Sequence, residues 1–354
     1  MPNPILTQAI DALASRRDLS AAATAEVLAE IMHGEASETQ IAGFLIALRT
    51  KGETVEELTG LARTMRELAA HVPTKRDDLL DTSGTGGGTS SFNVSTTAAL
   101  IATGAGCAVA KHGNRSATSR SGSADLLEAL GARIDLDPAG VAACIEEAGF
   151  GFMFAPHHHQ ATRYVVPVRA ELAVRTIFNL LGPLTNPAGA RRQLVGISDA
   201  RFQPTMAGAL AELGVDRALV VAAEDGLDEV SASAPTNVIE VNGEEIRSYV
   251  LHPQDVGIAA APAGPGVQKG GTPQENAAVT RAILRAEGAA ASSPPGEALA
   301  VINAGAAIYA AGAVGTIAEG VQAAREAIAD GRAAAALEHY VQASVRHARA
   351  GAGP

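Results

Sequence analysis

The sequence predicts an α/β protein with a small N-terminal helical domain and a large α/β domain, whose mainly parallel central sheet is flanked by helices. Residues 1–72 carry apolar residues at helical spacing. From residue 78 onward, short apolar runs alternate with helical stretches, which is typical of a parallel sheet covered on both faces. The 354 residues are enough for two domains and a large core.

Two capping signals organise the N-terminal helices. Ser37 is followed three residues later by Gln40, and Thr54 by Glu57, as in the capping box. Each signal precedes an apolar helical face, and Pro73 marks the expected domain boundary. The two faces consist of Ile41, Phe44, Leu45 and Leu48, and of Leu58, Leu61, Met65 and Leu68.

Short apolar runs predict the strands of the second domain. The expected strands cover residues 79–80, 107–110, 150–154, 193–197 and 218–222. A hairpin signal follows at 238–243, where Asn242-Gly243 favours a tight turn. Beyond the hairpin, a proline- and glycine-rich segment predicts a loop, and three later segments are predicted to be helices. The loop is expected over 260–271 and the helices over 276–287, 296–311 and 315–348.

Composition excludes several classes of partner. The net charge of −11 argues against binding to nucleic acid or to an anionic membrane, because both need a basic surface. Cys107 and Cys144 suit neither a disulfide framework nor a zinc site, so we expect them in the core. The sequence contains no signal segment and no run long enough to span a bilayer, which predicts a cytoplasmic protein without membrane contact.

Two glycine- and serine-rich loops between residues 81 and 131 predict a phosphate site. The first contains residues 84–88 and leads into the helix expected from Ser95. The second contains Lys111 and Arg115 and leads into the helix expected from Ser123. Glycine lets a backbone approach a ligand closely, and helix N-termini offer free N–H groups to an anion. Two such loops indicate a ligand with two separated phosphate groups.

Asp228-Glu229 is the best acidic pair of the chain. It follows the strand expected at 218–222, so it lies at a carboxyl end of the sheet, where ligands bind in such folds. From the residues alone, a solvated acidic loop is the better interpretation.

The motifs around these loops resemble the anthranilate phosphoribosyltransferase family. The family carries GTGG, N-[IV]-S-T, K-H-G-N-R and S-G-S-A-D in this order, and here they occupy 84–87, 93–96, 111–115 and 121–125. Two later segments also match, and the resemblance covers nearly the whole chain. These segments are Pro167-Val168-Arg169 and residues 174–187.

The resemblance implies both the reaction and the architecture. The reaction would be transfer of the phosphoribosyl group from phosphoribosyl pyrophosphate to the amine of anthranilate, with two magnesium ions. Residues 1–73, with a returning segment near 166–190, would form the helical domain and the interface of a homodimer. Residues 74–165 and 191–354 would form the domain that binds the phosphoribosyl donor.

The resemblance also assigns site residues. Magnesium would bind Ser95, Asp228 and Glu229. The aromatic acid would contact Gly84, Asn114 and Arg169, where a guanidinium suits a carboxylate; the alternative for Arg169 is a surface ion pair with Glu171. The donor would contact Gly84, Gly87, Gly88, Ser91, Asn93, Val94, Ser95, Thr96, Lys111, His112, Gly113, Asn114, Arg115, Ser116, Ala117, Thr118, Ser119 and Ser123.

The sequence departs from the family's pattern at two places. After GTGG the family has Asp, whereas this chain has Gly88 in a loop one residue shorter, so the metal arrangement can differ. In the family's H-H-P-A-M-[KR]-H segment, Gln160 and Thr162 replace the proline and the methionine. A more polar acceptor channel would admit a modified aminobenzoate, which is the alternative acceptor.

Other interpretations are weaker but distinct. A nucleoside-phosphorylase-like enzyme would share the Lys-x-x-x-Arg and Ser-Gly-x-Ala-Asp patterns, and a nucleic-acid-binding paralogue would need a basic stripe. His157-His158-His159 invites a zinc site, but consecutive side chains rarely converge on one metal. Arg175, Asn179 and Asn186 fit a hinge or polar core role as well as a ligand role.

Overall fold

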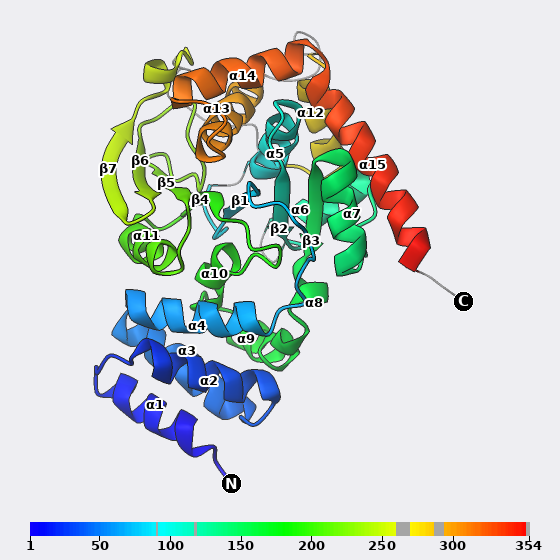
Figure 1. Ribbon diagram of the computed structural model, residues 1–354. Helices are drawn as coiled ribbons and strands as arrows, with labels where there is room; N and C mark the ends of the chain where they lie inside the picture. Colours follow the sequence, from blue (N-terminus) through cyan, green and yellow to red (C-terminus); the bar gives the residue numbers. More distant parts are fainter. Residues whose placement is uncertain (90, 117–118, 260–269, 287–293, 352–354) are drawn as a thin grey trace.

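A helical bundle and a seven-stranded sheet with helices on both faces make up the protein (Figure 1). The computed structural model describes residues 1–89, 91–116, 119–259, 270–286 and 294–351. The predicted fold class is confirmed. Most of the loop predicted at 260–271 lies outside the described residues.

The bundle lies at one end of the molecule and consists of α1–α4 (Figure 1). At the start of α4, Thr54 Oγ1 accepts from the N–H of Glu57, and Glu57 Oε2 accepts from the N–H of Thr54, as the capping box predicts. Ser37 caps α3, but Gln40 does not return the bond, because its side-chain amide bonds instead to the main chain of Asn3. The bounds are α1 Pro4–Ala14, α2 Ala21–His33, α3 Glu38–Lys51 and α4 Val55–Glu67.

The apolar faces predicted for the bundle are buried with one exception. All four predicted residues on α3 are buried, as are Leu58, Leu61 and Met65 on α4. Leu68 is 38% exposed, because α4 ends at Glu67 and Leu68 is its C-cap. Its predicted burial is wrong.

The sheet has the strand order β3-β2-β1-β4-β5-β6-β7. The first five strands in this order are parallel, and β6 and β7 add an antiparallel hairpin, as predicted around Asn242-Gly243. The outer strand β7 exposes Ile246 and Val250. The bounds are β1 Leu80–Gly84, β2 Val109–Gly113, β3 Phe150–Phe154, β4 Arg192–Gly196, β5 Arg217–Ala223, β6 Thr236–Asn242 and β7 Glu245–Leu251.

Two strands run further than predicted, which changes the place of several site residues. β2 continues through Lys111, His112 and Gly113, whose backbones pair with β3. β1 continues to Gly84, which pairs with Gly196 of β4. The apolar runs ended earlier because polar side chains at these strand ends face the site, so residues 111–113 belong to the sheet and not to a loop.

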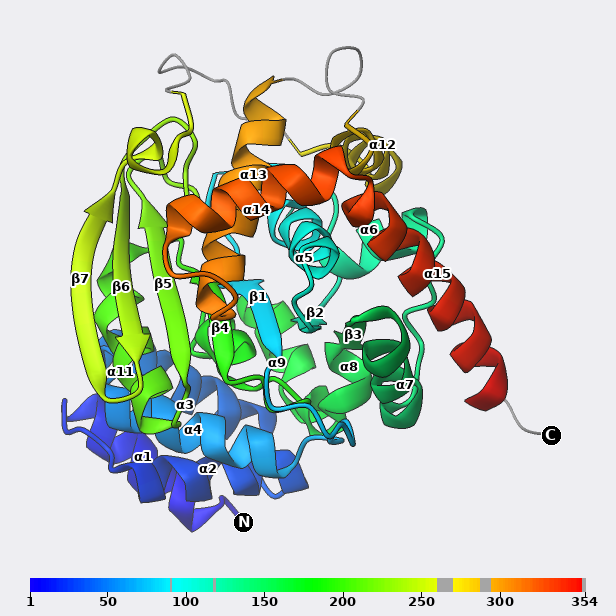
Figure 2. The same ribbon diagram turned by 45° about the horizontal axis from the view of Figure 1, so that its top comes forward.

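Helices cover both faces of the sheet. On one face, α5 packs against α13, α14 and α15 (Figure 2), and on the other face α11 packs against β5, β6 and the bundle helix α4. The single helix predicted at 315–348 is wrong: it is divided into α14 and α15 at Gly331, whose φ is +74°. The bounds are α5 Val94–Gly104, α6 Ser123–Ala129, α7 Pro138–Ala148, α11 Gln203–Glu212, α12 Pro273–Leu284, α13 Pro294–Ala310, α14 Ile317–Ala329 and α15 Arg332–Gly351.

A returning segment joins the sheet to the bundle. α8 and α9 follow β3, and α10 lies between α4 and β4 (Figure 1). Val168, Leu180 and Leu184 of this segment belong to the same apolar core as the bundle and α11. The bounds are α8 Ala155–His158, α9 Val166–Leu172 and α10 Phe178–Leu181, with 3₁₀ turns at Gln160–Tyr164, Gly182–Leu184, Ala200–Phe202 and Pro253–Val256.

The point where the strand order reverses lies between β1 and β4. From β1 the chain continues to β2 and β3 on one side, whereas β4 and β5 lie on the other side. Ligands of open α/β sheets bind at such a point, beyond the carboxyl ends of the strands. Gly84 and Gly196 end these two strands.

Cys107 and Cys144 are buried and unbonded, as predicted. None of the helices in the described ranges has the length and apolar character needed to cross a bilayer.

Candidate active site

The first glycine loop, residues 84–89, follows β1 and lies directly on the loop that carries the acidic pair. The N–H of Gly86 donates to Asp228 Oδ2 over 3.0 Å, and the N–H of Thr89 donates to the carbonyl of Gly226 over 2.8 Å. A Cβ at Gly88 would lie 2.8 Å from the Gly226 oxygen and 3.0 Å from Asp228 Oδ1. Only a residue without a side chain fits this contact, so Gly88 is the residue that permits it.

Asp228 is also packed against the end of β4. A Cβ at Gly196 would lie 1.7 Å from the Asp228 carbonyl oxygen, so only glycine allows the acidic loop to approach the sheet there. The structure therefore brings Asp228 to the carboxyl ends of the paired strands β1 and β4, as the sequence predicted for the carboxyl end of the sheet.

Both carboxyl groups of the acidic pair have a raised pKa. Burial, followed by repulsion from Asp228, raises the pKa of Glu229 to about 8. Burial also raises the pKa of Asp228, although hydrogen bonds from its own N–H and that of Gly86 oppose the rise. Since Asp228 is also bonded to Gly86 and packed against Gly196, the pair does not lie in the solvated acidic loop that the residues alone favoured.

Lys111 lies in the sheet beneath the acidic pair. Its side chain is buried, and Nζ donates to the main-chain oxygen of Thr82, to Thr82 Oγ1 over 3.2 Å and to Ser95 Oγ over 3.3 Å. Burial lowers the pKa of Lys111, whereas the carboxylates of Asp81 and Glu229 raise it. The lysine is thus a buried amine held by Thr82 and Ser95, and the two carboxylates favour its charged form.

Asp81 supports this arrangement and was not singled out from the sequence. It is buried and accepts from the Asn186 amide over 2.8 Å and from the N–H of His112 over 3.1 Å. Asn186 also donates to the carbonyl of Ala110, which gives it a polar core role. Asp81 precedes the first glycine loop by only three residues, but nothing in the sequence shows that its side chain points inward.

The described residues of the second loop, 114–116 and 119–122, are held mainly by side chains close to them in sequence. Asp125 accepts from the N–H groups of Gly122 and Ser116 over 2.9 and 3.2 Å. Arg115 lies 2.7 Å from Asp125 and 2.6 Å from Glu128, so its charge is paired within the protein. These ion pairs raise the pKa of Arg115 above its ordinary value.

Close packing shapes the start of the second loop. A Cβ at Gly113 would lie 2.3 Å from Ser123 Oγ and 2.8 Å from the Phe152 ring. Ser123 Oγ donates to the carbonyl of Asn114, and Ser119 bonds to Ser116 through both its N–H and its hydroxyl. The structure brings these predicted donor residues together around one turn.

Asn93, which precedes α5, connects the second loop to α12. Its Nδ2 donates to the Ser121 carbonyl over 3.0 Å, and its Oδ1 accepts from Ser121 Oγ and from Asn276 Nδ2 over 3.0 and 2.8 Å. The predicted role of Asn93 as a donor ligand therefore competes with a structural role.

Several predicted donor residues turn their side chains away from the loops. Val94 and Thr96 are buried in the first turn of α5, so only their main chains can face a ligand. Ser91 Oγ donates to the carbonyl of Phe92. Ala117 and Thr118 lie outside the described residues.

Buried histidines attach the acceptor region to the sheet and to the bundle. His112 Nδ1 lies 3.1 Å from the Gly182 carbonyl oxygen, and His159 Nε2 lies 3.1 Å from that of Thr185. His158 Nδ1 lies 2.8 Å from the carbonyl oxygen of Ala70. Burial lowers the pKa of His112 to about 3 and that of His159 to about 4, so both rings stay neutral. The histidines are thus hydrogen-bonded to main chain and do not point at a common centre.

Arg169 lies on α9, away from the two loops. Its guanidinium stands 5.5 Å from the centre of the Phe178 ring, and burial lowers its pKa. Over the described ranges it forms no ion pair with Glu171, and no hydrogen bond joins it to Gly84 or Asn114. The acceptor residues are therefore not assembled in direct contact.

Arg175 reaches the first loop from the returning segment, which the sequence left undecided. Its Nη1 donates to the carbonyl of Gly86, and its Nη2 donates to that of Thr85 over 3.1 Å. In the sequence, the only indication of a role for Arg175 was its position inside a segment that matches the family closely.

Ser95, Asp228 and Glu229 fit a hard divalent cation. Two carboxylates and a hydroxyl are oxygen donors, and burial together with repulsion from Asp228 raises the pKa of Glu229 although Lys111 opposes the rise, so a bound cation would stabilise the ionised pair. In the described residues, no group of three or more His, Cys, Asp or Glu side chains lies close enough together for a metal site of that kind.

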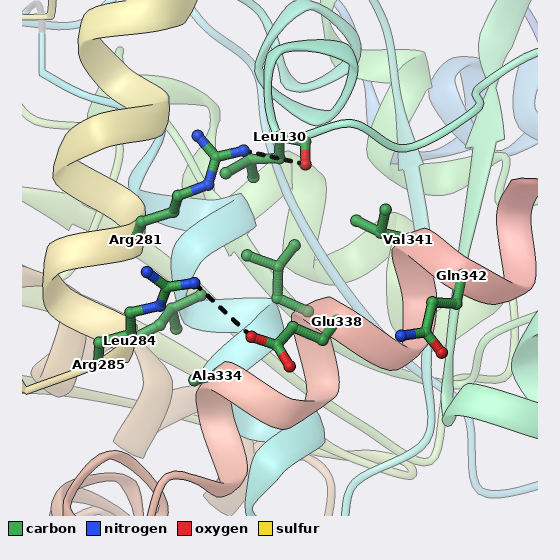
Figure 3. Close-up of a pocket in the computed structure, with 9 residues that line it drawn as sticks. Leu130, Arg281, Leu284, Arg285, Ala334, Glu338, Val341 and Gln342 are labelled. Carbon is green, nitrogen blue, oxygen red and sulfur yellow. Dashed lines mark hydrogen bonds and ion pairs between the residues drawn. The ribbon is translucent and has the colours of Figure 1, made fainter.

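A separate cavity of about 260 Å³ lies between α12, α15 and the end of α6 (Figure 3). Arg281 and Arg285 point toward it from α12, and Glu338 faces Arg285 from α15. None of the predicted site residues lines this cavity.

Comparisons with known proteins cover both parts of the chain. The family described as glycosyl transferase family, a/b domain matches residues 76–334, and the family described as glycosyl transferase family, helical bundle domain matches residues 7–69.

Similar proteins share one activity in their names. The anthranilate phosphoribosyltransferase of Rubrobacter xylanophilus is 50% identical over 350 residues, which cover 98% of this chain and 100% of that protein. The enzyme of that name from Symbiobacterium thermophilum is 48% identical, over 92% of this chain and 94% of its own.

Two solved structures match the fold closely. The anthranilate phosphoribosyltransferase of Thermus thermophilus has a TM-score of 0.88 at 45% identity, covering 95% of this chain and 99% of that one. That of Saccharomyces cerevisiae, in complex with PRPP (phosphoribosyl pyrophosphate) and Mg, has a TM-score of 0.86 at 26% identity, covering 96% and 98%.

Proposed function

This chain belongs to the anthranilate phosphoribosyltransferase family, and we propose that its two glycine loops and its acidic pair carry out the family's reaction. The protein transfers the phosphoribosyl group of phosphoribosyl pyrophosphate to the amine of anthranilate. The amine nitrogen bonds to the anomeric carbon, the bond from that carbon to pyrophosphate breaks, and the nitrogen loses a proton. The products are N-(5-phosphoribosyl)anthranilate and pyrophosphate, in the second step of tryptophan biosynthesis.

The contact between Asp228 and the first glycine loop carries this proposal. It places a pair of carboxyl groups beside the main chain of the first loop, at the carboxyl ends of the paired strands β1 and β4. Departure of pyrophosphate from a sugar needs neutralised charge and aligned reactants more than a strong nucleophile. The site brings the main chain of the first loop and possible cation ligands together.

Ser95, Asp228 and Glu229 would hold the magnesium ion. Bound magnesium neutralises charge on the departing pyrophosphate. Lys111 contributes a fixed positive charge beneath the acidic pair, and its buried position keeps Ser95 Oγ oriented. The second magnesium ion stays a prediction.

We propose that the second loop binds the donor's other phosphate. The N–H groups and hydroxyls of Ser116, Ser119 and Ser123 surround one turn, and Asp125 holds that turn in shape. Arg115 supports the loop through its ion pairs and is less available to the ligand than the sequence suggested.

The acceptor is anthranilate, whose carboxylate we propose to pair with Arg169. The altered-acceptor alternative has little support from the two departures, because Gln160 is exposed and Thr162 Oγ1 already donates to the carbonyl of His159 over 2.6 Å. Gly84 and Asn114 are proposed to contact the same acid.

The predicted dimer stays part of this proposal. Exposed apolar side chains occur on the bundle side at Ile46, Val166 and Val174. These side chains would be covered in a homodimer, which sedimentation velocity would detect. The division into two domains and the cytoplasmic location stay predictions.

A fluorescence assay tests the proposed reaction. Purified protein with phosphoribosyl pyrophosphate, magnesium and anthranilate is expected to consume anthranilate and release an equal amount of pyrophosphate. A panel of substituted aminobenzoates at fixed donor concentration tests the acceptor. Absence of turnover with anthranilate, or phosphorolysis of a nucleoside by inorganic phosphate, would contradict the proposal.

A further inference from the structure

The main chain of Gly86 forms hydrogen bonds with three side chains from distant parts of the chain. Its N–H donates to Asp228, and its carbonyl accepts from Ser198 Oγ over 2.8 Å and from Arg175 Nη1. Arg175 Nη2 extends the contact to the neighbouring carbonyl of Thr85. The first glycine loop therefore owes its shape partly to one side chain of the returning segment.

The main chain of Arg175 is attached to the bundle. Arg49 Nη1, on α3, donates to the Arg175 carbonyl over 2.6 Å. Two residues earlier, Ala173 ends α9 with φ +52°, a conformation that a non-glycine residue adopts at an energetic cost. Arg175 thus connects the bundle to the first loop through a strained turn.

The guanidinium of Arg175 has carbonyls and not carboxylates as its partners. Within the described ranges, no carboxylate oxygen lies within 4.0 Å of it. A Cβ at Gly87 would lie 1.8 Å from Nη1, so the main chain of the loop packs directly against the guanidinium. A guanidinium is planar with forked donors, which suits two adjacent carbonyls and which a lysine ammonium cannot reproduce.

We propose that Arg175 is a positioning residue that holds the first glycine loop in the shape that receives the donor. It acts through Thr85 and Gly86 and not through contact with the reacting atoms. The proposal rests on the function given above, because it concerns the loop assigned to the donor. Without Arg175, the loop loses its connection to the bundle while Asp228 and Ser198 keep their positions.

Three variants test the proposal. Arg175→Gln removes the charge and the fork, and Arg175→Lys keeps the charge but loses the fork. Arg201→Gln is the matched control, because Arg201 is an 85% exposed arginine near Ser198 whose partner is Asp199. Thermal unfolding establishes first that each variant is folded; should Arg175→Gln not fold, Arg175→Lys and the control decide the test.

The first measurement uses no substrate. Hydrogen–deuterium exchange of peptides covering residues 80–95 is expected to be about tenfold faster in Arg175→Gln and faster in Arg175→Lys, because a hydrogen bond between charged and neutral partners is worth about a factor of ten. Exchange in Arg201→Gln should equal that of the unaltered protein. Equal exchange in all proteins, or full protection in Arg175→Lys, would overturn the proposal.

The second measurement is kinetic. Both Arg175 variants are expected to raise KM for phosphoribosyl pyrophosphate about tenfold while kcat changes less than about threefold, since the lost interaction positions the loop before chemistry. A fall in kcat with unchanged KM would overturn the positioning role. Because the exchange result does not depend on turnover, a failure of the proposed function would leave it interpretable.

Discussion

The two glycine loops are built in opposite ways. The first loop bonds to segments that are distant in sequence: Thr85 to Gly196, Gly86 to Asp228, and both carbonyls to Arg175. The described residues of the second loop bond mostly to near neighbours, through Asp125, Arg115 and Ser116, and Asn93 adds a more distant partner. The first loop can therefore respond to changes elsewhere in the molecule, whereas the second depends mainly on contacts within residues 93–128.

This difference assigns different tasks to the loops. A loop bonded to the acidic pair and to the bundle connects metal binding, donor binding and the acceptor-side segment. A loop stabilised mainly by side chains close to it in sequence can hold a phosphate with little involvement of the bundle or the acidic pair. The predictions below test this division, from the largest expected effect to the smallest.

Replacing both acidic residues should remove the first loop's cation site. Asp228→Asn with Glu229→Gln is expected to lower kcat/KM by more than about 100-fold, because losing metal ligands and the charge they hold costs at least that much. Activity should no longer depend on magnesium concentration. Glu224→Gln, an acid of the same loop, is the control and should retain normal dependence. Unchanged magnesium affinity in the double variant would disprove the metal assignment.

Removing Arg169 should affect the acceptor and neither loop. Arg169→Ala is expected to lower kcat/KM for anthranilate about 30-fold, because a charge-assisted pair is worth about 2 kcal/mol. Steady-state kinetics with each substrate varied in turn provide the measurement. Arg163→Ala, which removes an exposed arginine stacked on Tyr164, should have little effect. Equal damage to donor KM would count against the assignment.

Magnesium affinity should depend steeply on pH. The pKa of Glu229 is about 8 without metal, and its ionised form is the ligand, so protonation competes with magnesium. Affinity is expected to rise about tenfold per pH unit below that pKa and to level off above it. Calorimetry at pH 7 in buffers of different ionisation enthalpy should show release of about one proton per ion. Affinity independent of pH between about 6 and 8 would show that Glu229 is not a ligand.

The same pKa shift makes a stability prediction. Since the folded protein holds the Glu229 proton more tightly than the unfolded chain, whose ordinary glutamate pKa is 4.5, metal-free stability should fall as pH rises from 4.5 to about 8. Glu229→Gln should flatten this part of the profile of thermal unfolding against pH. The raised pKa would be contradicted if the stability of the unaltered protein rose over this pH range and Glu229→Gln showed the same profile.

The smallest effect is expected in the second loop. Asp125→Asn should weaken the ion pair with Arg115 and the bonds to Gly122 and Ser116, at a cost of about 1 kcal/mol in unfolding free energy. Donor KM should rise only a few-fold, because the loop's other contacts remain. Glu128→Gln removes the other partner of Arg115 without touching the loop's N–H groups, so its donor KM should be normal. A larger donor effect in Glu128→Gln than in Asp125→Asn would reverse this ranking.

Local patterns made most of the fold predictable. The helical bundle, the alternation of strands and helices, and the hairpin at Asn242-Gly243 all follow from spacing and turn residues within short windows. Strand ends were missed where polar side chains continue the strand, as at Lys111 and His112. The break at Gly331 was missed because alanine-rich sequence on both sides hides it.

The site was predictable to the extent that its contacts are local. The second loop and its partner Asp125 lie in one motif, and Asp228 could be placed from the strand before it. The contacts of Arg175 and Ser198 with the first loop span up to 113 residues, so they depend on tertiary packing that no local pattern encodes. The burial that raises the pKa of Glu229 is likewise a property of the folded chain alone.

The hairpin at the end of the sheet has a consequence for handling the protein. In the described part of the chain β7 is the last strand, so one side of its backbone offers unpaired N–H and C=O groups, and Ile246 and Val250 stand beside them in solvent. Such an edge is a template for pairing with a strand of another molecule. The charged side chains of Glu245 and Arg247 on the same strand disfavour such pairing. Concentrated samples should therefore aggregate first through this strand, and a lysine in place of Ile246 or Val250 should extend their shelf life without altering turnover.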